Sequence, residues 1–187
     1  MRGNGCDTDG VFWTPYPRDV VQVAGADAAT FLQSQLSQDI RQLSTGDSAW
    51  SFLLQPTGKI DVLLRVAHTA EDLFVLDTDA GHGATMVARL NRFKIRVQVE
   101  ISELPWRCIA VRGDGAAATG AEGLASWGGG VDLLDDEPTP PANAEVGTAD
   151  DLLSARIDAV WPAMGFEIAP GETIPGETGV VSLAVNF

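Results

Sequence analysis

One stretch in the first half of the chain, residues 50–68, constrains the fold more than any other. Apolar side chains alternate along two parts of it, first at Trp50, Phe52 and Leu54 and then at Ile60, Val62, Leu64 and Val66. Alternation with a period of two is typical of half-buried β-strands. The intervening residues 55–59 contain a proline that presets one backbone dihedral and a glycine that tolerates positive φ. We therefore expect an antiparallel hairpin.

The other face of the second strand carries an unusual mixture of side chains. Asp61, Leu63 and Arg65 alternate with the apolar positions, so the two charged groups flank a leucine on one face, roughly 7 Å apart along the strand. Spacing alone favours a solvated face. The alternative is one wall of a ligand site.

Segments on both sides of the hairpin extend the sheet and add two helices. Apolar and β-branched runs predict strands at residues 20–23, 73–76 and 97–101. Helical spacing predicts one helix after Gly25, with Asp27 in its first turn, and another through residues 86–93, with Asp79 as a possible cap. Residues 20–101 thus read β-α-β-β-β-α-β. This order predicts an α+β fold, an antiparallel sheet with both helices on one face.

The rest of the chain predicts a second α+β lobe. Apolar runs indicate strands at residues 108–111 and 179–187, and a helix is expected at 149–160 with its apolar face formed by Leu152, Leu153, Ile157 and Val160. The acidic, proline-rich residues 135–147 indicate a solvated loop. We therefore expect an irregular N-terminal arm at 1–19, a first α+β lobe at 20–104 and a second lobe at 105–187.

Charge and cysteine content exclude several classes of protein. The 187 residues carry a net charge of −14 with only 12 Lys and Arg, which opposes direct binding to nucleic acid or to an anionic membrane. Cys6 and Cys108 show no metal-ligand spacing, and residues 1–19 lack the order of a secretory signal. These features predict a reduced, cytoplasmic protein without a metal site of its own.

Positive charge gathers at one place in this acidic chain. Arg92, Lys94 and Arg96 lie at the end of the second predicted helix. They are either a solvated helix end, where cations are favourable, or an anchor for an anionic ligand such as a glutamate tail. The two histidines, His68 and His82, lie in no nucleophile or metal-ligand pattern.

Five stretches, in order and at suitable spacing, resemble the folate-binding YgfZ proteins, which are relatives of the glycine-cleavage T-protein. The stretches are Gly25–Asp39, Leu54–Ile60, Arg92–Val97, Ala155–Ala159 and Ile174–Glu177. The resemblance implies that a ferredoxin-like first lobe, at residues 20–104, and a second α+β lobe enclose a tetrahydrofolate pocket. It also implies a role in the assembly or repair of iron–sulfur clusters, with iron–sulfur enzymes or assembly proteins as partners and an indirect effect on tRNA thiolation.

A folate pocket requires an apolar slot with a few polar groups and a cationic exit. We expect Asp61, Leu63 and Arg65 to form one wall of it, and Lys59 and Arg96 to hold the carboxylates of the tail. Arg156 matches the Arg-Ile-x-Ala stretch that abuts the pocket in the family.

The resemblance also predicts how the chain departs from its relatives in chemistry. Counted without gaps from Gly58, the aspartate that positions the reacting folate nitrogen in T-proteins falls on Leu63. Leucine cannot accept a proton, so we expect a binding module and no aminomethyl transfer, unless Asp61, one pleat earlier on the same face, replaces it. The open alternatives are an active tetrahydrofolate-dependent aminomethyltransferase and a non-catalytic T-protein-like subunit of a larger oxidase.

The end of the chain carries a further expectation. The family signature Lys-Gly-Cys-Tyr-x-Gly-Gln-Glu would begin just after Phe187, followed by a C-terminal barrel. We expect either a fragment or a natural short form. The apolar residues 180–187 would then lack a partner and favour aggregation or dimerisation, although the sequence does not determine the oligomeric state.

Overall fold

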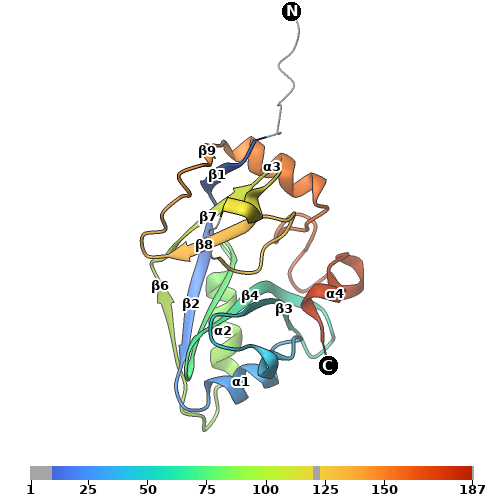
Figure 1. The fold of residues 1–187 in the computed structure, drawn as a ribbon. Coiled ribbons are helices and arrows are strands. Elements are labelled where there is room, and N and C mark those ends of the chain that lie inside the picture. Colours follow the sequence, from blue (N-terminus) through green and yellow to red (C-terminus); the bar gives the residue numbers. More distant parts are fainter. Residues whose placement is uncertain (1–9, 120–122, 187) are drawn as a thin grey trace, which may run out of the picture. The chain divides into compact units, whose positions relative to one another are not determined.

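The computed structural model describes residues 10–119 and 123–186, which belong to two compact units (Figure 1). Unit 1 comprises residues 10–17 together with Trp106–Trp161, and unit 2 comprises Arg18–Pro105 together with the chain from Pro162 onward. The chain passes from unit 2 into unit 1 after Pro105. The residues after Trp161 belong to unit 2, however, and not to the second lobe in which the sequence placed them.

Unit 2 is built on a five-stranded antiparallel sheet in the order β3-β4-β5-β2-β6. Its strands are β2 (Arg18–Ala24), β3 (Ser48–Leu54), β4 (Ile60–Ala70), β5 (Leu73–Asp79) and β6 (Glu100–Leu104). The predicted hairpin is confirmed as the β3–β4 pair. In its turn the Gln55 amide donates to the Lys59 carbonyl (2.7 Å), and Gly58 adopts a φ of 80°.

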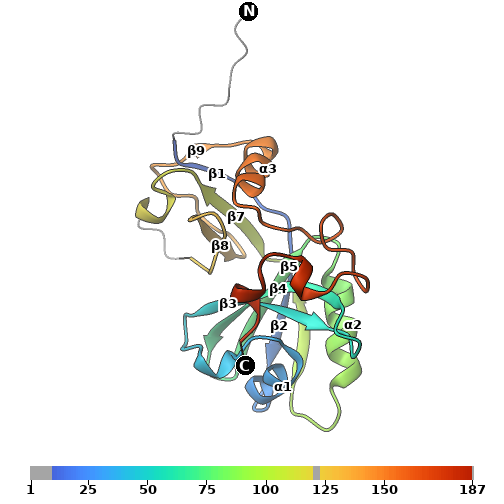
Figure 2. The same ribbon diagram turned by 90° about the vertical axis from the view of Figure 1, so that its right-hand side faces the viewer.

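Two helices cover one face of this sheet, as expected (Figure 2). Helix α1 (Ala28–Gln35) and helix α2 (Gly83–Phe93) contribute Phe31, Leu32, Met86 and Leu90 to an apolar core with strand residues such as Leu64 and Leu76. The observed order β2-α1-β3-β4-β5-α2-β6 matches the predicted order of elements. The α+β class is confirmed.

The start of α2 differs from the prediction. His82 is the N-cap residue, and Asp79 is not the cap. A carboxylate from another strand takes that role: Oδ2 of Asp19 accepts hydrogen bonds from the amides of Gly81 (2.9 Å) and Gly83 (2.7 Å). A negative charge is favourable at this positive end of the helix dipole. The predicted strand at 97–101 also starts later, at Glu100.

Within unit 2, the last part of the chain is joined to the start of β4 by backbone hydrogen bonds. The amide of Ile60 donates to the carbonyl of Thr173 (2.9 Å), and the amide of Gly171 donates to the carbonyl of Ile60 (2.7 Å). The strand predicted at 179–187 is wrong for the described residues, because Val181–Ala184 forms the short helix α4 beside β3. Phe187 lies outside the described residues.

Unit 1 contains a four-stranded sheet in the order β8-β7-β1-β9. Its strands are β1 (Phe12–Pro15), β7 (Arg107–Arg112), β8 (Val131–Asp135) and β9 (Glu145–Val146), and they pack with Ala116 around a small apolar core. Strand β1 lies within residues 1–19, which the sequence analysis expected to be irregular, because its pairing with β7 supplies the hydrogen bonds that its short sequence did not reveal.

Helix α3 (Ala149–Asp158) of unit 1 is present as expected, and a capping box between Thr148 and Asp151 starts it. None of its residues is buried, so its apolar side chains do not join a core. Among the described residues, every helix falls short of the length and apolar character that a membrane span requires.

Candidate functional site

The candidate site lies on the helix-free face of the unit 2 sheet, which we call the ionic face. Along β4, the side chains of Val62, Leu64 and Val66 enter the helix-covered core, so those of Leu63 and Arg65 point to the opposite side. In the register of the sheet, Leu63 lies opposite Phe52, and Arg65 lies opposite Trp50 on one side and Asp77 on the other.

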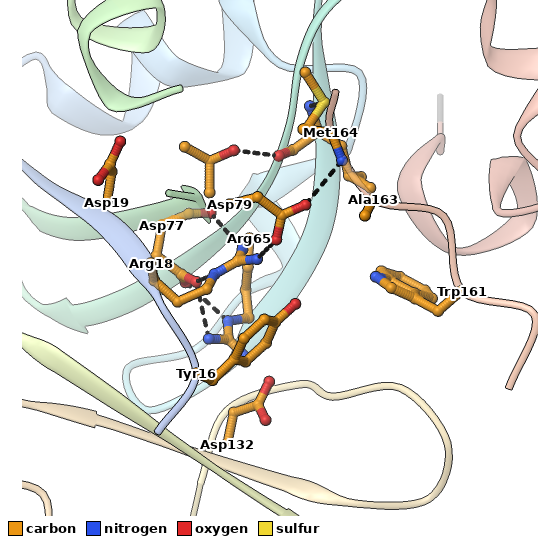
Figure 3. A network of polar contacts seen from close by, with 12 residues as sticks. Tyr16, Arg18, Asp19, Arg65, Asp77, Asp79, Asp132, Trp161, Ala163 and Met164 are labelled. Carbon is orange, nitrogen blue, oxygen red and sulfur yellow. Dashed lines mark hydrogen bonds and ion pairs between the residues drawn. The ribbon is translucent and has the colours of Figure 1, made fainter. Parts of the chain in front are cut away.

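Four charged side chains form the centre of the ionic face (Figure 3). Arg65 donates two hydrogen bonds to Asp77, from Nε to Oδ1 (2.9 Å) and from Nη2 to Oδ2 (3.0 Å). Arg18 donates from Nε to the same carboxylate (2.7 Å) and also pairs with Asp79. Two arginines and two aspartates give a cluster with no net charge.

Burial and charge act in opposite directions on Asp77. Its side chain is 1% exposed, and this burial opposes ionisation. The charges and hydrogen bonds of Arg65 and Arg18 outweigh the burial and hold the pKa of Asp77 below its usual range. Asp77 is therefore a carboxylate that stays ionised, and it is unsuited to deliver a proton near neutral pH.

An aromatic ring lies beside the charged cluster. The guanidinium carbon of Arg65 is 5.2 Å from the centre of the Trp50 ring, and that of Arg18 is 5.7 Å from it. Both distances are within the range of cation–π attraction. With Phe52 and Leu63 also buried, the solvated face that spacing alone favoured is wrong.

The chain after Trp161 covers part of the ionic face. The amide of Met164 donates to Oδ2 of Asp79 (2.9 Å), and the amide of Leu63 lies 3.3 Å from the sulfur of Met164. The hydroxyl of Thr78 donates to the carbonyl of Leu63 (2.8 Å). The side chain and the backbone of Leu63 are thus both enclosed, so this position offers an apolar contact and no acid–base group.

Asp61 does not share the face of Leu63, so that expectation is wrong. Leu53 pairs with Val62 and Leu54 with Ile60, which leaves Asp61 as the extra residue of a β-bulge. Its carboxylate lies 3.3 Å from Nε of Arg89 and accepts a hydrogen bond from Gln55 (2.7 Å). Because Arg89 belongs to α2, these contacts turn the carboxylate toward the helix-covered side.

The structure brings together only some of the predicted site residues. Lys59 is half-buried in the β3–β4 turn, at the end of the sheet where Arg18 pairs with Asp79. Arg96 is exposed in the loop before β6, near the other end, where Ala24 pairs with Glu100. Arg156 belongs to unit 1, and its Nη1 donates to the Trp161 carbonyl (3.0 Å).

The site also contains four residues that were not expected from the sequence: Arg18, Asp77, Asp79 and Trp50. A signal was present in β5, where Asp77 and Asp79 alternate on one face of an otherwise apolar strand. A buried carboxylate in such a strand requires a cation on a neighbouring strand, and Arg65 is the charged residue in the middle of β4.

Unit 1 carries several hollows. One, of about 440 Å³, is lined by Trp13, Ile109, Arg107 and the proline-containing residues 137–140. Another, of about 310 Å³, includes Asp114 and Asp158, and this acidic lining is unfavourable for an anionic ligand. Within the part of the chain that the structure describes, no three His, Cys, Asp or Glu side chains gather as a metal-binding group.

No protein-family model matches the sequence. An uncharacterized protein of Haemophilus influenzae is 25% identical over 95 residues, which represent 51% of this chain and 34% of that protein. Among solved structures, the glycine cleavage system aminomethyltransferase T from Bartonella henselae is similar, with a TM-score of 0.68 and 19% sequence identity. That match covers 89% of this chain and 55% of the transferase, so this chain spans about half the length of its structural neighbour. The likeness establishes a T-protein-like fold.

Proposed function

We propose that the chain is a folate-binding module that assists other proteins and does not itself transfer aminomethyl groups. The proposal rests on the observation of a T-protein-like fold in which the enclosed Leu63 occupies the predicted place of the reactive aspartate. The fold supports a reduced folate as the ligand, because the similar solved structure is an aminomethyltransferase of the glycine cleavage system.

The local chemistry supports binding without turnover. Aminomethyl transfer requires a group that can hold a proton or a developing positive charge beside the reacting nitrogen, and leucine offers neither. Asp61 is engaged by Arg89 and Gln55 on the other side of the sheet. Asp77 is locked between two arginines. In this proposal the folate is held and released unchanged.

The roles of the binding residues follow from their burial. Leu63 contributes apolar wall, and Lys59, half-buried in the turn, is the cation proposed to hold the glutamate tail. Arg65 is fully buried against Asp77, so its role is to support the sheet and not to hold the tail. Arg156 is proposed as a folate contact on the family resemblance alone.

The resemblance to YgfZ proteins extends the proposal to a cellular role. Folate binding would couple the protein to the assembly or repair of iron–sulfur clusters in the cytoplasm, with iron–sulfur enzymes or assembly proteins as partners. The test is the activity of such an enzyme in cells that lack the protein. Restored activity on re-expression of the chain supports the role, and unchanged activity after its removal contradicts it.

The binding proposal is tested by calorimetric titration of the full chain with tetrahydrofolate at low and moderate salt. We expect modest, salt-sensitive binding, because exposed cation–carboxylate pairs are screened. Lys59→Ala should weaken binding by about two- to fivefold. Arg96→Ala is the matched control and should leave binding unchanged, since Arg96 lies near the other end of the sheet. No heat from a folded chain at either salt would end the folate proposal.

The absence of transfer is tested separately by supplying glycine-derived aminomethyl groups on the lipoyl carrier protein together with tetrahydrofolate. We expect no turnover. Turnover that Asp61→Asn abolishes would assign the protein to the enzymes and give Asp61 the role that Leu63 cannot fill.

A further inference from the structure

Positive charge is concentrated in one short stretch of unit 2, residues 92–96, which we call the basic segment. Residues 80–99 contain four of the 12 Lys and Arg and none of the 26 Asp and Glu. Three of these cations, at positions 92, 94 and 96, alternate with Phe93 and Ile95. The folate proposal does not use this segment, which lies near the end of the sheet remote from Lys59.

The basic segment is an exposed surface of mixed character. Ile95 is 70% exposed and Phe93 is 38% exposed. Within residues 10–119 and 123–186, no carboxylate pairs with Arg92, Lys94 or Arg96. The negative end of the α2 dipole makes a cation at Arg92 favourable. It does not account for the large apolar side chain of Ile95, which is exposed to water. Alternating cations and apolar groups fit a partner that offers both carboxylates and an apolar surface.

Helix α3 of unit 1 presents a surface with the complementary character. Leu153 (46% exposed) and Ile157 (62%) are four residues apart and share one side of α3, and Val160 (82%) follows the end of the helix. Exposed Asp150 precedes Leu153 by nearly one turn, and exposed Asp158 follows Ile157. An exposed apolar stripe of this kind is typical of an interaction surface.

We propose that the basic segment of one copy of the chain docks on α3 of a second copy. The apolar stripe would receive Phe93 and Ile95, while Asp150 and Asp158 would pair with the flanking cations. A second copy is favoured over nucleic acid or an anionic membrane, because the net charge of −14 repels both and the basic segment is too short to offset it. Because the two surfaces differ, two copies can exchange both contacts in a two-fold dimer, or successive copies can join head-to-tail in rings or open chains.

Salt has two opposing effects on this contact. Two chains with a charge of −14 repel each other at long range, which opposes association at low ionic strength. At about 0.15 M salt the Debye length is about 8 Å, so the long-range repulsion is screened more than ion pairs in contact. We therefore expect association to be strongest at intermediate salt and to decline toward 1 M.

The experiment measures the weight-average mass of the full chain by light scattering over a range of concentrations. We expect the mass of the wild type to rise with concentration. The variant R92E/R96E carries acidic groups on both surfaces, and the variant D150K/D158K carries basic groups on both, so each alone should stay monomeric, with association at least about tenfold weaker. When the two variants are mixed, the acidic segment of the first faces the basic α3 of the second, and the basic segment of the second faces the acidic α3 of the first. Mixing should therefore restore association.

Matched controls separate this contact from a general effect of charge. R92K/R96K keeps the positive charge, and E71K/E172K makes the same charge change as D150K/D158K at two exposed acidic residues of unit 2. Both controls should associate like the wild type, and thermal unfolding of every variant checks that it is folded. A wild-type monomer at all concentrations, association that survives both reversals, or folded variants that fail to associate when mixed would each overturn the proposal.

Discussion

The two faces of the unit 2 sheet are buried to a similar degree by opposite means. On the helix-covered face, Leu64, Leu76 and Met86 are fully buried in an apolar core. On the ionic face, Arg65 is also fully buried and Asp77 is 1% exposed, but these two side chains form an ion pair joined by hydrogen bonds. Apolar burial stabilises in proportion to area, whereas a buried ion pair must first offset the cost of dehydration. We therefore expect the first face to supply stability and the second to depend on complete pairing.

The largest effect is expected from breaking the pairing on the ionic face. Asp77→Asn removes the negative charge that pairs with both Arg65 and Arg18, so two buried guanidinium groups lose this partner charge. We expect a loss of about 4 kcal/mol in the free energy of unfolding, measured by urea denaturation. Asp79→Asn, at a side chain that is 19% exposed, is the control and should cost less. A loss below about 1 kcal/mol for Asp77→Asn would mean that pairing contributes little to this face.

The helix-covered face should respond to lost volume. Leu64→Ala removes apolar atoms from a fully buried position and should cost about 3 kcal/mol in the same measurement. The matched control is Leu153→Ala on exposed α3, which should change stability by less than about 0.5 kcal/mol at dilute, monomeric concentration. If Leu64→Ala cost no more than its control, the burial of apolar area would not be the source of stability on this face.

The two faces should also differ in their response to pH. The pKa of Asp77 is lower in the folded protein than its usual value, so its stabilisation is present above that usual value and is lost as the pH falls through the folded pKa. Stability should therefore decline below about pH 4. At pH 3 the loss should be smaller than either substitution effect, because one pH unit below the usual pKa corresponds to about 1.4 kcal/mol at most. Urea denaturation between pH 7 and 2 should show this acid decline reduced in Asp77→Asn and kept in Leu64→Ala. An unchanged decline in Asp77→Asn would assign it to other carboxylates.

The smallest effect on stability is expected at the start of α2, where Asp19 of β2 accepts hydrogen bonds from the helix. Asp19→Ala removes the carboxylate that accepts from the amides of Gly81 and Gly83, and it should cost about 1 kcal/mol. Hydrogen exchange should accelerate in the first turn of α2 and not in the middle of β5. Uniform acceleration across the sheet would show that Asp19 supports more than the helix end.

Local patterns predicted the elements of unit 2 well. The alternation around residues 50–66 and the Pro-Thr-Gly turn gave the hairpin, because side-chain direction in a strand depends on sequence parity alone. The same parity failed at Asp61, where a bulge adds one residue to the strand. A bulge depends on how two strands pair, and neither strand carries a clear signal of it.

The site was predictable only in outline. Arg65 and Leu63 were identified as members of one face, but spacing favoured water where the protein places Trp50 and Asp77. The final segment was misread for a related reason. Its β-branched residues favour a strand, yet the side chains of Ser37 and Gln38 donate to the carbonyls of Ala184 and Leu183 and hold a short helix against β3.

The sequence by itself determined the α+β class, the order of strands and helices in unit 2 and the leucine at position 63, because these depend on periodicity and residue identity over short spans. The tertiary structure decided which charges are buried. The pairing of Arg65 with Asp77 requires two strands in one register, and the cover over Leu63 comes from Met164, about a hundred residues later. Such contacts gain their energy from groups that meet only after the chain folds.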